Sequence, residues 1–228
     1  MPDENLFAAD VRRIRGIQRT PEQVKMQNYF RGGCMAPKDA AFDELFSGLK
    51  NGGKFDLMAV QQRAIEKIGL DLSEISEIPP LCLDGFLFPR NDAYALDAAV
   101  RRGRDGFMRS SRYEIVWLFF SATQVYLYDL KFSLTTDNNR EKTEEYFYKD
   151  ITGFSSENEN IEVKYCAGGC MGGMRKTNMP YNNFKLSVPG TDPFYCPYGG
   201  WNLDQNKIDE VEARIQGMKQ KLREKKAQ

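Results

Sequence analysis

The sequence predicts an α+β protein in which helices come first, antiparallel strands follow, and one long helix comes last. Three observations support this fold class. The first 80 residues carry helix start and stop signals, residues 113–188 read as short strands, and an amphipathic pattern runs from Asp204 to about Lys225. We therefore predict a helical segment over residues 1–80, followed by a β-rich part with a closing helix over residues 81–228.

Helix signals divide the first 80 residues into three predicted helices. Thr20 is followed by Pro21 and, three residues after the cap, by Gln23, which is the pattern of a capped helix start, and Gly32 ends this helix. The second helix is expected from about residue 38 to residue 51, and the third from a cap at residue 56 to residue 69. The residue before Pro79 is pushed out of the helical region, so we place a domain boundary near residue 80.

The β-rich part is expected to begin with a short strand at Leu83–Phe88, followed by the ambiguous stretch Tyr94–Arg112. Tyr113–Phe120 is apolar at nearly every position, so we expect both of its faces to be covered. Four more strands are predicted, at Thr123–Leu130 with an extension towards Leu134, Glu144–Ile151, Ile161–Tyr165 and Phe184–Val188. The last two alternate apolar with polar residues, which indicates one face in water.

The closing helix carries a regular apolar stripe. Ile208, Val211, Ile215, Met218 and Leu222 follow one another at spacings of 3, 4, 3 and 4 residues, so they share one helix face. This pattern favours packing against the sheet. The alternative is a short coiled-coil seam to a partner, although sustained coiled coils usually need three or four heptads.

Composition excludes several classes of function. Lys+Arg and Asp+Glu balance at 32 each, so no global field attracts nucleic acid or an acidic membrane, and such binding needs a local patch. The chain has no histidine, which removes Ser-His-Asp and Cys-His catalysis and every zinc site that uses histidine. We therefore expect no enzyme and no cofactor; an enzyme that works without histidine is the least favoured alternative.

Cysteine usage and the N-terminus predict a cytoplasmic protein. The acidic N-terminus lacks the basic and apolar regions of a signal peptide, and the longest apolar run, Ile115–Phe120, is far too short to span a bilayer. Five cysteines without a secretion signal indicate reduced thiols.

The segment from Glu145 to Ser155 (EYFYKDITGFS), followed by Ile161–Tyr165, Asn183–Ser187 and the closing helix, resembles bacterial pleckstrin-homology-like (PH-like) domains. The resemblance covers roughly residues 83–225 and leaves the N-terminal helices unassigned. It implies an antiparallel β-barrel closed by the last helix, and a binding role towards phospholipid head groups or peptides. Lipid-binding relatives place basic residues in the loop between the first two strands, which here corresponds to about residues 100–112.

That loop is rich in arginine. Guanidinium groups suit phosphate and carboxylate because they bind them through two parallel hydrogen bonds. The candidate residues for an anionic ligand are Arg101, Arg102, Arg104, Arg109 and Arg112. The alternative is a solvated loop whose surface ion pairs contribute little.

The Gly-rich stretch 166–179 is compositionally unusual. Three residues separate Cys166 from Cys170, where zinc pairs usually have two, and no second pair is visible, so we predict no metal site. Met174 and Arg175 follow Gly173 where a phosphate loop needs Lys and Ser or Thr. We expect a flexible loop whose candidate partner contacts are Met171, Met174 and Met179.

Four tyrosines, Tyr126, Tyr128, Tyr146 and Tyr148, occupy alternate positions on neighbouring predicted strands. Such a stripe can stack single-stranded nucleic acid, but packing against the N-terminal helices is favoured, and we expect no nucleic acid partner. The predicted function is a non-catalytic interaction module that binds an unidentified protein in a bacterial cytoplasm. The alternative is recruitment to an anionic membrane surface through the Arg-rich loop.

Overall fold

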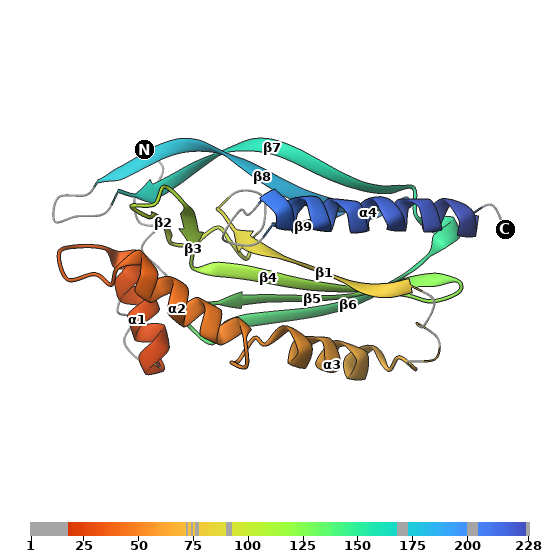
Figure 1. The fold of residues 1–228 in the computed structure, drawn as a ribbon, viewed down its shortest axis with the longest axis horizontal. Coiled ribbons are helices and arrows are strands. Elements are labelled where there is room, and N and C mark those ends of the chain that lie inside the picture. Colours follow the sequence, from red (N-terminus) through yellow and green to blue (C-terminus); the bar gives the residue numbers. More distant parts are fainter. Residues whose placement is uncertain are drawn as a thin grey trace.

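A computed structural model describes residues 18–71, 73, 75, 78–89, 93–167, 173–199 and 205–226 of the 228-residue chain. The α+β class is as predicted, with helices first, strands next and a helix last (Figure 1). The helices are α1 (Pro21–Arg31), α2 (Asp39–Lys50), α3 (Leu57–Ile68) and α4 (Gln205–Lys226), with a 3-10 turn η2 at Tyr148–Asp150. The strands are β1 (Ile78–Leu87), β2 (Val100–Arg102), β3 (Met108–Ser110), β4 (Arg112–Phe120), β5 (Gln124–Ser133), β6 (Asn139–Phe147), β7 (Gly153–Cys166), β8 (Met174–Ser187) and β9 (Phe194–Pro197).

The strands form two sheets, which are almost entirely antiparallel. The first has the order β1-β4-β5-β6 and the second β3-β2-β7-β8-β9. One parallel step joins β2 to β7, where Arg101 pairs with Cys166. Within the described residues the two sheets are not hydrogen-bonded into a closed barrel.

Strand β4 lies at the centre of the molecule, and all nine of its residues are buried. Side chains alternate across a strand, so Ile115 and Phe119 pack into the core formed with α1–α3, whereas Val116 and Leu118 pack into the core formed with the second sheet and α4. Figure 1 shows these layers, with α2 and α3 on one side of the first sheet and β7, β8 and α4 on the other. The prediction that both faces of this segment are covered is confirmed.

Local capping follows the sequence signals closely. The Thr20 hydroxyl accepts a hydrogen bond from Gln23 N (3.3 Å), and the Gln23 side chain accepts one from Thr20 N (2.9 Å), which makes a reciprocal capping box. Asp56 caps α3 by accepting hydrogen bonds from Met58 N and Ala59 N. By contrast, the N-cap residue of α2, Lys38, makes no side-chain capping hydrogen bond.

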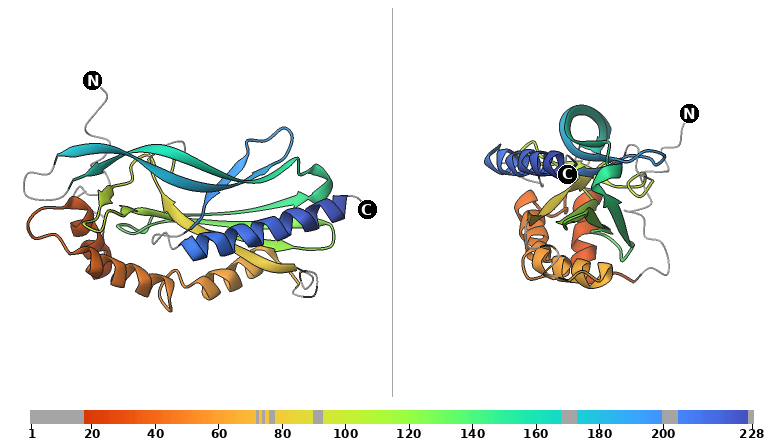
Figure 2. Two further views of the ribbon diagram at one scale, coloured as in Figure 1. Left: turned by 45° about the horizontal axis from the view of Figure 1, so that its top comes forward. Right: turned by 90° about the vertical axis from the view of Figure 1, so that its right-hand side faces the viewer.

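The apolar stripe of α4 packs into the core, as predicted. Ile215 is fully buried, and Ile208, Met218 and Leu222 are at most 8% exposed, in contact with the inter-sheet side of the first sheet. Figure 2 shows α4 running alongside the sheets. The packing interpretation is therefore correct for this stripe.

The tyrosine stripe divides between the two cores. Tyr126 and Tyr128 pack against the helices, as predicted. Tyr146 pairs with Val125, one position away from Tyr126, so it faces the opposite side of the sheet. Tyr146 and Tyr148 therefore pack with the α4 core, and the predicted helix contact is wrong for these two residues.

Several strand bounds differ from the predicted ones. The strand expected at Glu144–Ile151 is in fact β6, which ends at Phe147 before η2. Strands β7 and β8 are each 14 residues long, much longer than expected, because each has a polar half without apolar alternation that pairs with the alternating half of the other strand. Pro79 and Pro80 lie within β1 at an irregular register on its exposed edge, a position where a strand tolerates proline.

Candidate anion-binding site

The Arg-rich segment folds into a small hairpin, in which β2 and β3 pair and a turn at residues 103–107 connects them. The turn is tight. Gly103 N donates to Phe107 O (2.8 Å), and Phe107 N donates to the Asp105 carboxylate (3.0 Å). A Cβ at Gly103 would lie 2.4 Å from both Arg109 Nη1 and Asp105 Oδ1, so any larger residue would displace these two side chains. This hairpin sorts the five predicted arginines into two groups.

Arg109 belongs to the buried group and is fully inaccessible to solvent. Its Nε and Nη2 donate to the two carboxylate oxygens of Asp43 on α2, at 2.9 and 2.8 Å, and its Nη1 and Nη2 donate to Asp105 at 3.1 and 2.7 Å. Burial lowers the pKa of this guanidinium, but the hydrogen bonds to Asp105 and Asp43 outweigh it and raise the pKa above its ordinary value. Arg109 thus ties the hairpin to α2.

Arg112 is buried in a similar way, with 2% of its side chain exposed. Its Nη2 donates to both oxygens of Asp97, at 3.1 and 3.2 Å, and its guanidinium lies 4.8 Å from the centre of the Tyr94 ring. Neither Arg109 nor Arg112 lines the cavity to which the other three arginines contribute.

The other three arginines lie around one cavity of about 740 Å³. Its walls are the loop between α1 and α2, the hairpin from β2 into the turn, and the facing ends of β7 and β8. The cationic side chains in its lining are Lys38, Arg101, Arg102, Arg104 and Arg175. We call these five residues and the space between them the cationic cavity.

The single carboxylate in this lining, Asp39, is already occupied. Its Oδ2 accepts a hydrogen bond from Arg104 N (2.8 Å), and its Oδ1 accepts one from the Tyr29 hydroxyl (2.9 Å). Asp39 therefore anchors the turn of the hairpin to the start of α2. It forms no ion pair with a cationic side chain of the cavity in the part of the chain that the structure describes.

Most of the cavity's cations lack a counter-charge. Within the described residues, Lys38, Arg102, Arg104 and Arg175 form no ion pair. Arg101 is held differently, because its Nη1 donates to Tyr29 O (2.6 Å) and its guanidinium stacks 4.3 Å from the Tyr29 ring centre. The cavity thus concentrates positive charge on a chain whose formal net charge is zero.

A second large cavity, of about 550 Å³, lies between the two sheets and is rich in carboxylates. Some of its acidic groups form ion pairs: Lys142 contacts Glu144 at 2.7 Å, and Lys185, which lies outside the lining, contacts Glu157 at 3.0 Å. The buried Glu114 lies 3.3 Å from Lys131. The lining carries more carboxylates than lysines, so this cavity disfavours an anion, and we do not treat it as the anion-binding site.

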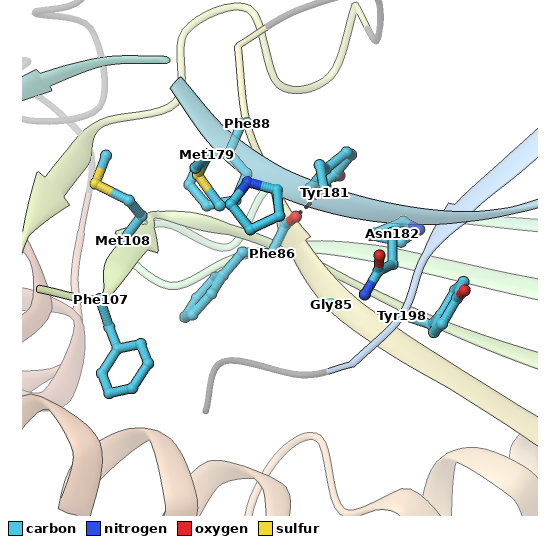
Figure 3. A pocket seen from close by; sticks show the side chains of 11 residues that line it. Gly85, Phe86, Phe88, Phe107, Met108, Met179, Tyr181, Asn182 and Tyr198 are labelled. Carbon is cyan, nitrogen blue, oxygen red and sulfur yellow. Dashed lines mark hydrogen bonds between the residues drawn. The ribbon is translucent and has the colours of Figure 1, made fainter. Parts of the chain in front are cut away.

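The two described methionines of the Gly-rich stretch, Met174 and Met179, do not share one surface. Met171 lies outside the described residues. Met174 is 54% exposed and directly precedes Arg175, so it lies at the edge of the cationic cavity. Met179 is partly buried against the helix-side core and lines a separate small cavity of about 40 Å³, with Asn182 and Tyr198 at its other end (Figure 3).

The expectation of wholly reduced thiols is wrong at Cys34, and the fifth cysteine, Cys170, lies outside the described residues. Cys34 is disulfide-bonded and lines the cationic cavity, whereas Cys82, Cys166 and Cys196 are free. Burial raises the pKa of the Cys82 and Cys196 thiols well above the ordinary value, so these two are unreactive. Among the described residues no group of three or more Cys, Asp or Glu side chains is arranged to hold a metal ion.

Two cavity residues, Lys38 and Arg175, were not identified from the sequence. They lie about 60 and 70 positions from the arginine cluster, and only the tertiary fold brings them to it. No helix among the described residues is long and apolar enough to cross a membrane. Comparisons with family models, with curated proteins and with solved structures each found no match.

Proposed function

We propose that this chain is a non-catalytic binding module whose cationic cavity takes a ligand that carries phosphate groups. The observation that carries the proposal is the set of four cations, Lys38, Arg102, Arg104 and Arg175, that surround one cavity without an ion pair among the described residues. Like charges repel when the cavity is empty, and an anion between them removes this repulsion. Guanidinium groups match the geometry of phosphate oxygens.

One further feature supports an oxyanion ligand. Helix α2 points its N-terminus at the cavity, with Lys38, Asp39 and Ala40 in the lining and no side chain capping the first turn. A helix N-terminus carries a partial positive charge and favours anions. The non-catalytic part of the proposal rests on the absence of histidine from the sequence.

The phosphate could belong to a soluble compound or to a lipid head group. The proposed PH-like relationship favours the lipid. Two largely antiparallel sheets, with the apolar stripe of α4 packed into the core that they share, are compatible with an open PH-like barrel. Met35 and Met174, which are 96% and 54% exposed, each adjoin a residue of the cavity lining. Exposed apolar side chains beside cations suit a membrane surface.

A protein partner is the second candidate, and the same two methionines favour it. Methionine is flexible and polarizable, so exposed methionines adapt to varied apolar surfaces. An acidic peptide would then occupy the cationic cavity while the methionines contact its apolar residues.

The experiment compares two phosphate sources. Binding of inorganic pyrophosphate is measured by calorimetry, and binding to vesicles of phosphatidylserine in phosphatidylcholine is measured by sedimentation, with vesicles of phosphatidylcholine alone as the blank. The variants Arg104→Ala and Arg175→Ala should each weaken binding about fivefold, since a basic residue near an anionic surface contributes about 1 kcal/mol. Arg223→Ala is the matched control, because this arginine is also exposed but lies on α4.

Added salt should weaken binding to either probe, since exposed charges are screened over roughly 8–10 Å. Binding to vesicles without binding to pyrophosphate identifies the lipid as the source, and the reverse identifies a soluble ligand. A wild-type protein that binds neither probe at low salt contradicts the proposal and leaves the protein partner as the function to test.

A further inference from the structure

We propose that the disulfide of Cys34 controls the cationic cavity, so that reduction by a dithiol weakens binding of the phosphate ligand. This inference rests on the proposed function and concerns the regulation of the same site. Its starting point is one juxtaposition: a disulfide-bonded cysteine stands in the wall of a cavity lined by five cationic side chains.

The wall that contains Cys34 is the loop between α1 and α2, which includes Gly33, Ala36 and Pro37. Its backbone hydrogen bonds are local: Gly32 N donates to Tyr29 O (3.1 Å), and Ala36 N donates to Gly33 O (3.3 Å). Neither of these bonds reaches the opposite wall. The loop also begins with two glycines at positive φ, Gly32 at 71° and Gly33 at 96°, which are residues with wide conformational freedom.

The loop leads directly into Lys38, which is one of the cations without an ion pair among the described residues. A covalent bond at Cys34 restricts the loop before any ligand arrives. Without that bond the ligand has to order the loop itself, and ordering a backbone costs conformational entropy. The oxidised protein should therefore hold the ligand more tightly than the reduced protein.

The cations of the cavity also suit Cys34 to thiol–disulfide exchange. When a thiolate of the dithiol attacks the other sulfur of the bond, the Cys34 sulfur leaves with a negative charge, which nearby cations stabilise. The second thiol of the reagent then attacks the mixed disulfide and releases the other protein cysteine as a thiolate. The protein disulfide gains two electrons and two protons, and the dithiol is oxidised to its own disulfide.

Binding and redox state are linked in both directions. If the disulfide raises the affinity for the ligand by a given factor, the ligand must stabilise the disulfide against reduction by the same factor. This reciprocity provides two independent measurements of one quantity, and the second does not require any substitution.

The first measurement is the affinity of the full chain for pyrophosphate, and for the phosphatidylserine vesicles, before and after treatment with dithiothreitol. We expect reduction to weaken binding about fivefold or more, which is the effect of freeing one backbone residue. Cys34→Ser should bind like the reduced protein. Cys166→Ser is the control, because Cys166 is free and pairs with Arg101 at the same end of the molecule.

The second measurement keeps the wild-type chain in a buffer of reduced and oxidised dithiothreitol. The intact fraction of the Cys34 disulfide, determined by alkylation and mass spectrometry, should rise when the bound probe is added. Equal affinity of the oxidised and reduced protein, or an unchanged intact fraction, overturns the inference while the proposed function stands. Binding in neither redox state overturns both, and tighter binding after reduction also overturns the inference.

Discussion

Arg104 and Arg109 lie five positions apart in one hairpin, yet their surroundings are opposite. Arg109 is fully buried and meets two carboxylates, Asp43 and Asp105. Arg104 is exposed, and its side chain forms no ion pair among the described residues; only its backbone nitrogen is held, by Asp39. The difference shows that an arginine with a structural role is paired with carboxylates of the protein, whereas an arginine with a binding role is unpaired and can form its ion pair with a ligand.

The contrast also explains what the N-terminal helices contribute. Helix α2 supplies Asp39 to the turn of the hairpin and Asp43 to its buried base, while Lys50 at the other end of α2 contacts Asp84 on β1. Tyr113 on β4 donates to the same Asp84 at 2.6 Å. The helices thus act as the frame on which the arginines are positioned, a role that the PH-like resemblance left unassigned.

The largest expected effect comes from removing the buried cation. Arg109→Met should lower the free energy of unfolding by about 3 kcal/mol, near the lower end of the range for breaking a buried ion pair. The lower end applies because Asp43 and Asp105 are 23% and 35% exposed, so water reaches both carboxylates once the guanidinium is gone. Urea unfolding followed by circular dichroism measures this loss.

Arg104→Met is the control for that experiment, because it removes the same group from the exposed end of the hairpin. It should change the free energy of unfolding by less than about 0.5 kcal/mol, as is usual for surface substitutions. Equal losses in the two variants would remove the distinction between the structural and the binding arginines.

A smaller loss is expected at the second buried arginine. Arg112→Met should lower the free energy of unfolding by about 2 kcal/mol, since hydrogen bonds to charged groups are worth about 1.5–3 kcal/mol and Asp97 is 39% exposed. The measurement is again urea unfolding. A loss larger than that of Arg109→Met would show that the number of carboxylate partners among the described residues does not set the order of the two losses.

Much of the fold could be predicted from the sequence because its signals are local. Three short-range sequence patterns correctly predicted structure: the capping box at Thr20, the apolar run of β4 and the apolar stripe of α4. The full lengths of β7 and β8 could not be predicted, since the polar half of each strand has no apolar alternation and is held by pairing with the other strand.

The site was predictable only in part. The arginine-rich composition indicated an anionic ligand, but the same composition does not reveal which arginines are buried. That division depends on Asp43 and Asp97, which reach Arg109 and Arg112 from α2 and from the segment before β2. Lys38 and Arg175 join the cavity through tertiary contacts alone, so no local pattern identifies them.

The smallest predicted effect is a pH dependence at the base of the hairpin. The hydrogen bonds from Arg109 lower the pKa of the Asp105 carboxyl below its ordinary value, and the hydrogen bond from Phe107 N acts in the same direction. A carboxyl whose pKa is lower in the folded state stabilises the fold above its unfolded pKa of about 3.9. This stabilisation is lost as the pH falls through the folded value.

Asp105→Asn should therefore be less stable than the wild type at neutral pH, and the gap between them should narrow as the pH falls below about 4. Asp150→Asn, at an exposed position in η2, is the matched control. In proteins that also carry Arg109→Met, the free energies of unfolding with Asp105 and with Asn at position 105 should be nearly equal at every pH. The main cause of the lowered pKa of Asp105 is then absent. With Arg109 present, a difference in free energy of unfolding between the wild type and Asp105→Asn that stays constant from neutral pH to about pH 3 would contradict the prediction. It would mean that the negative charge of Asp105 does not stabilise the buried arginine.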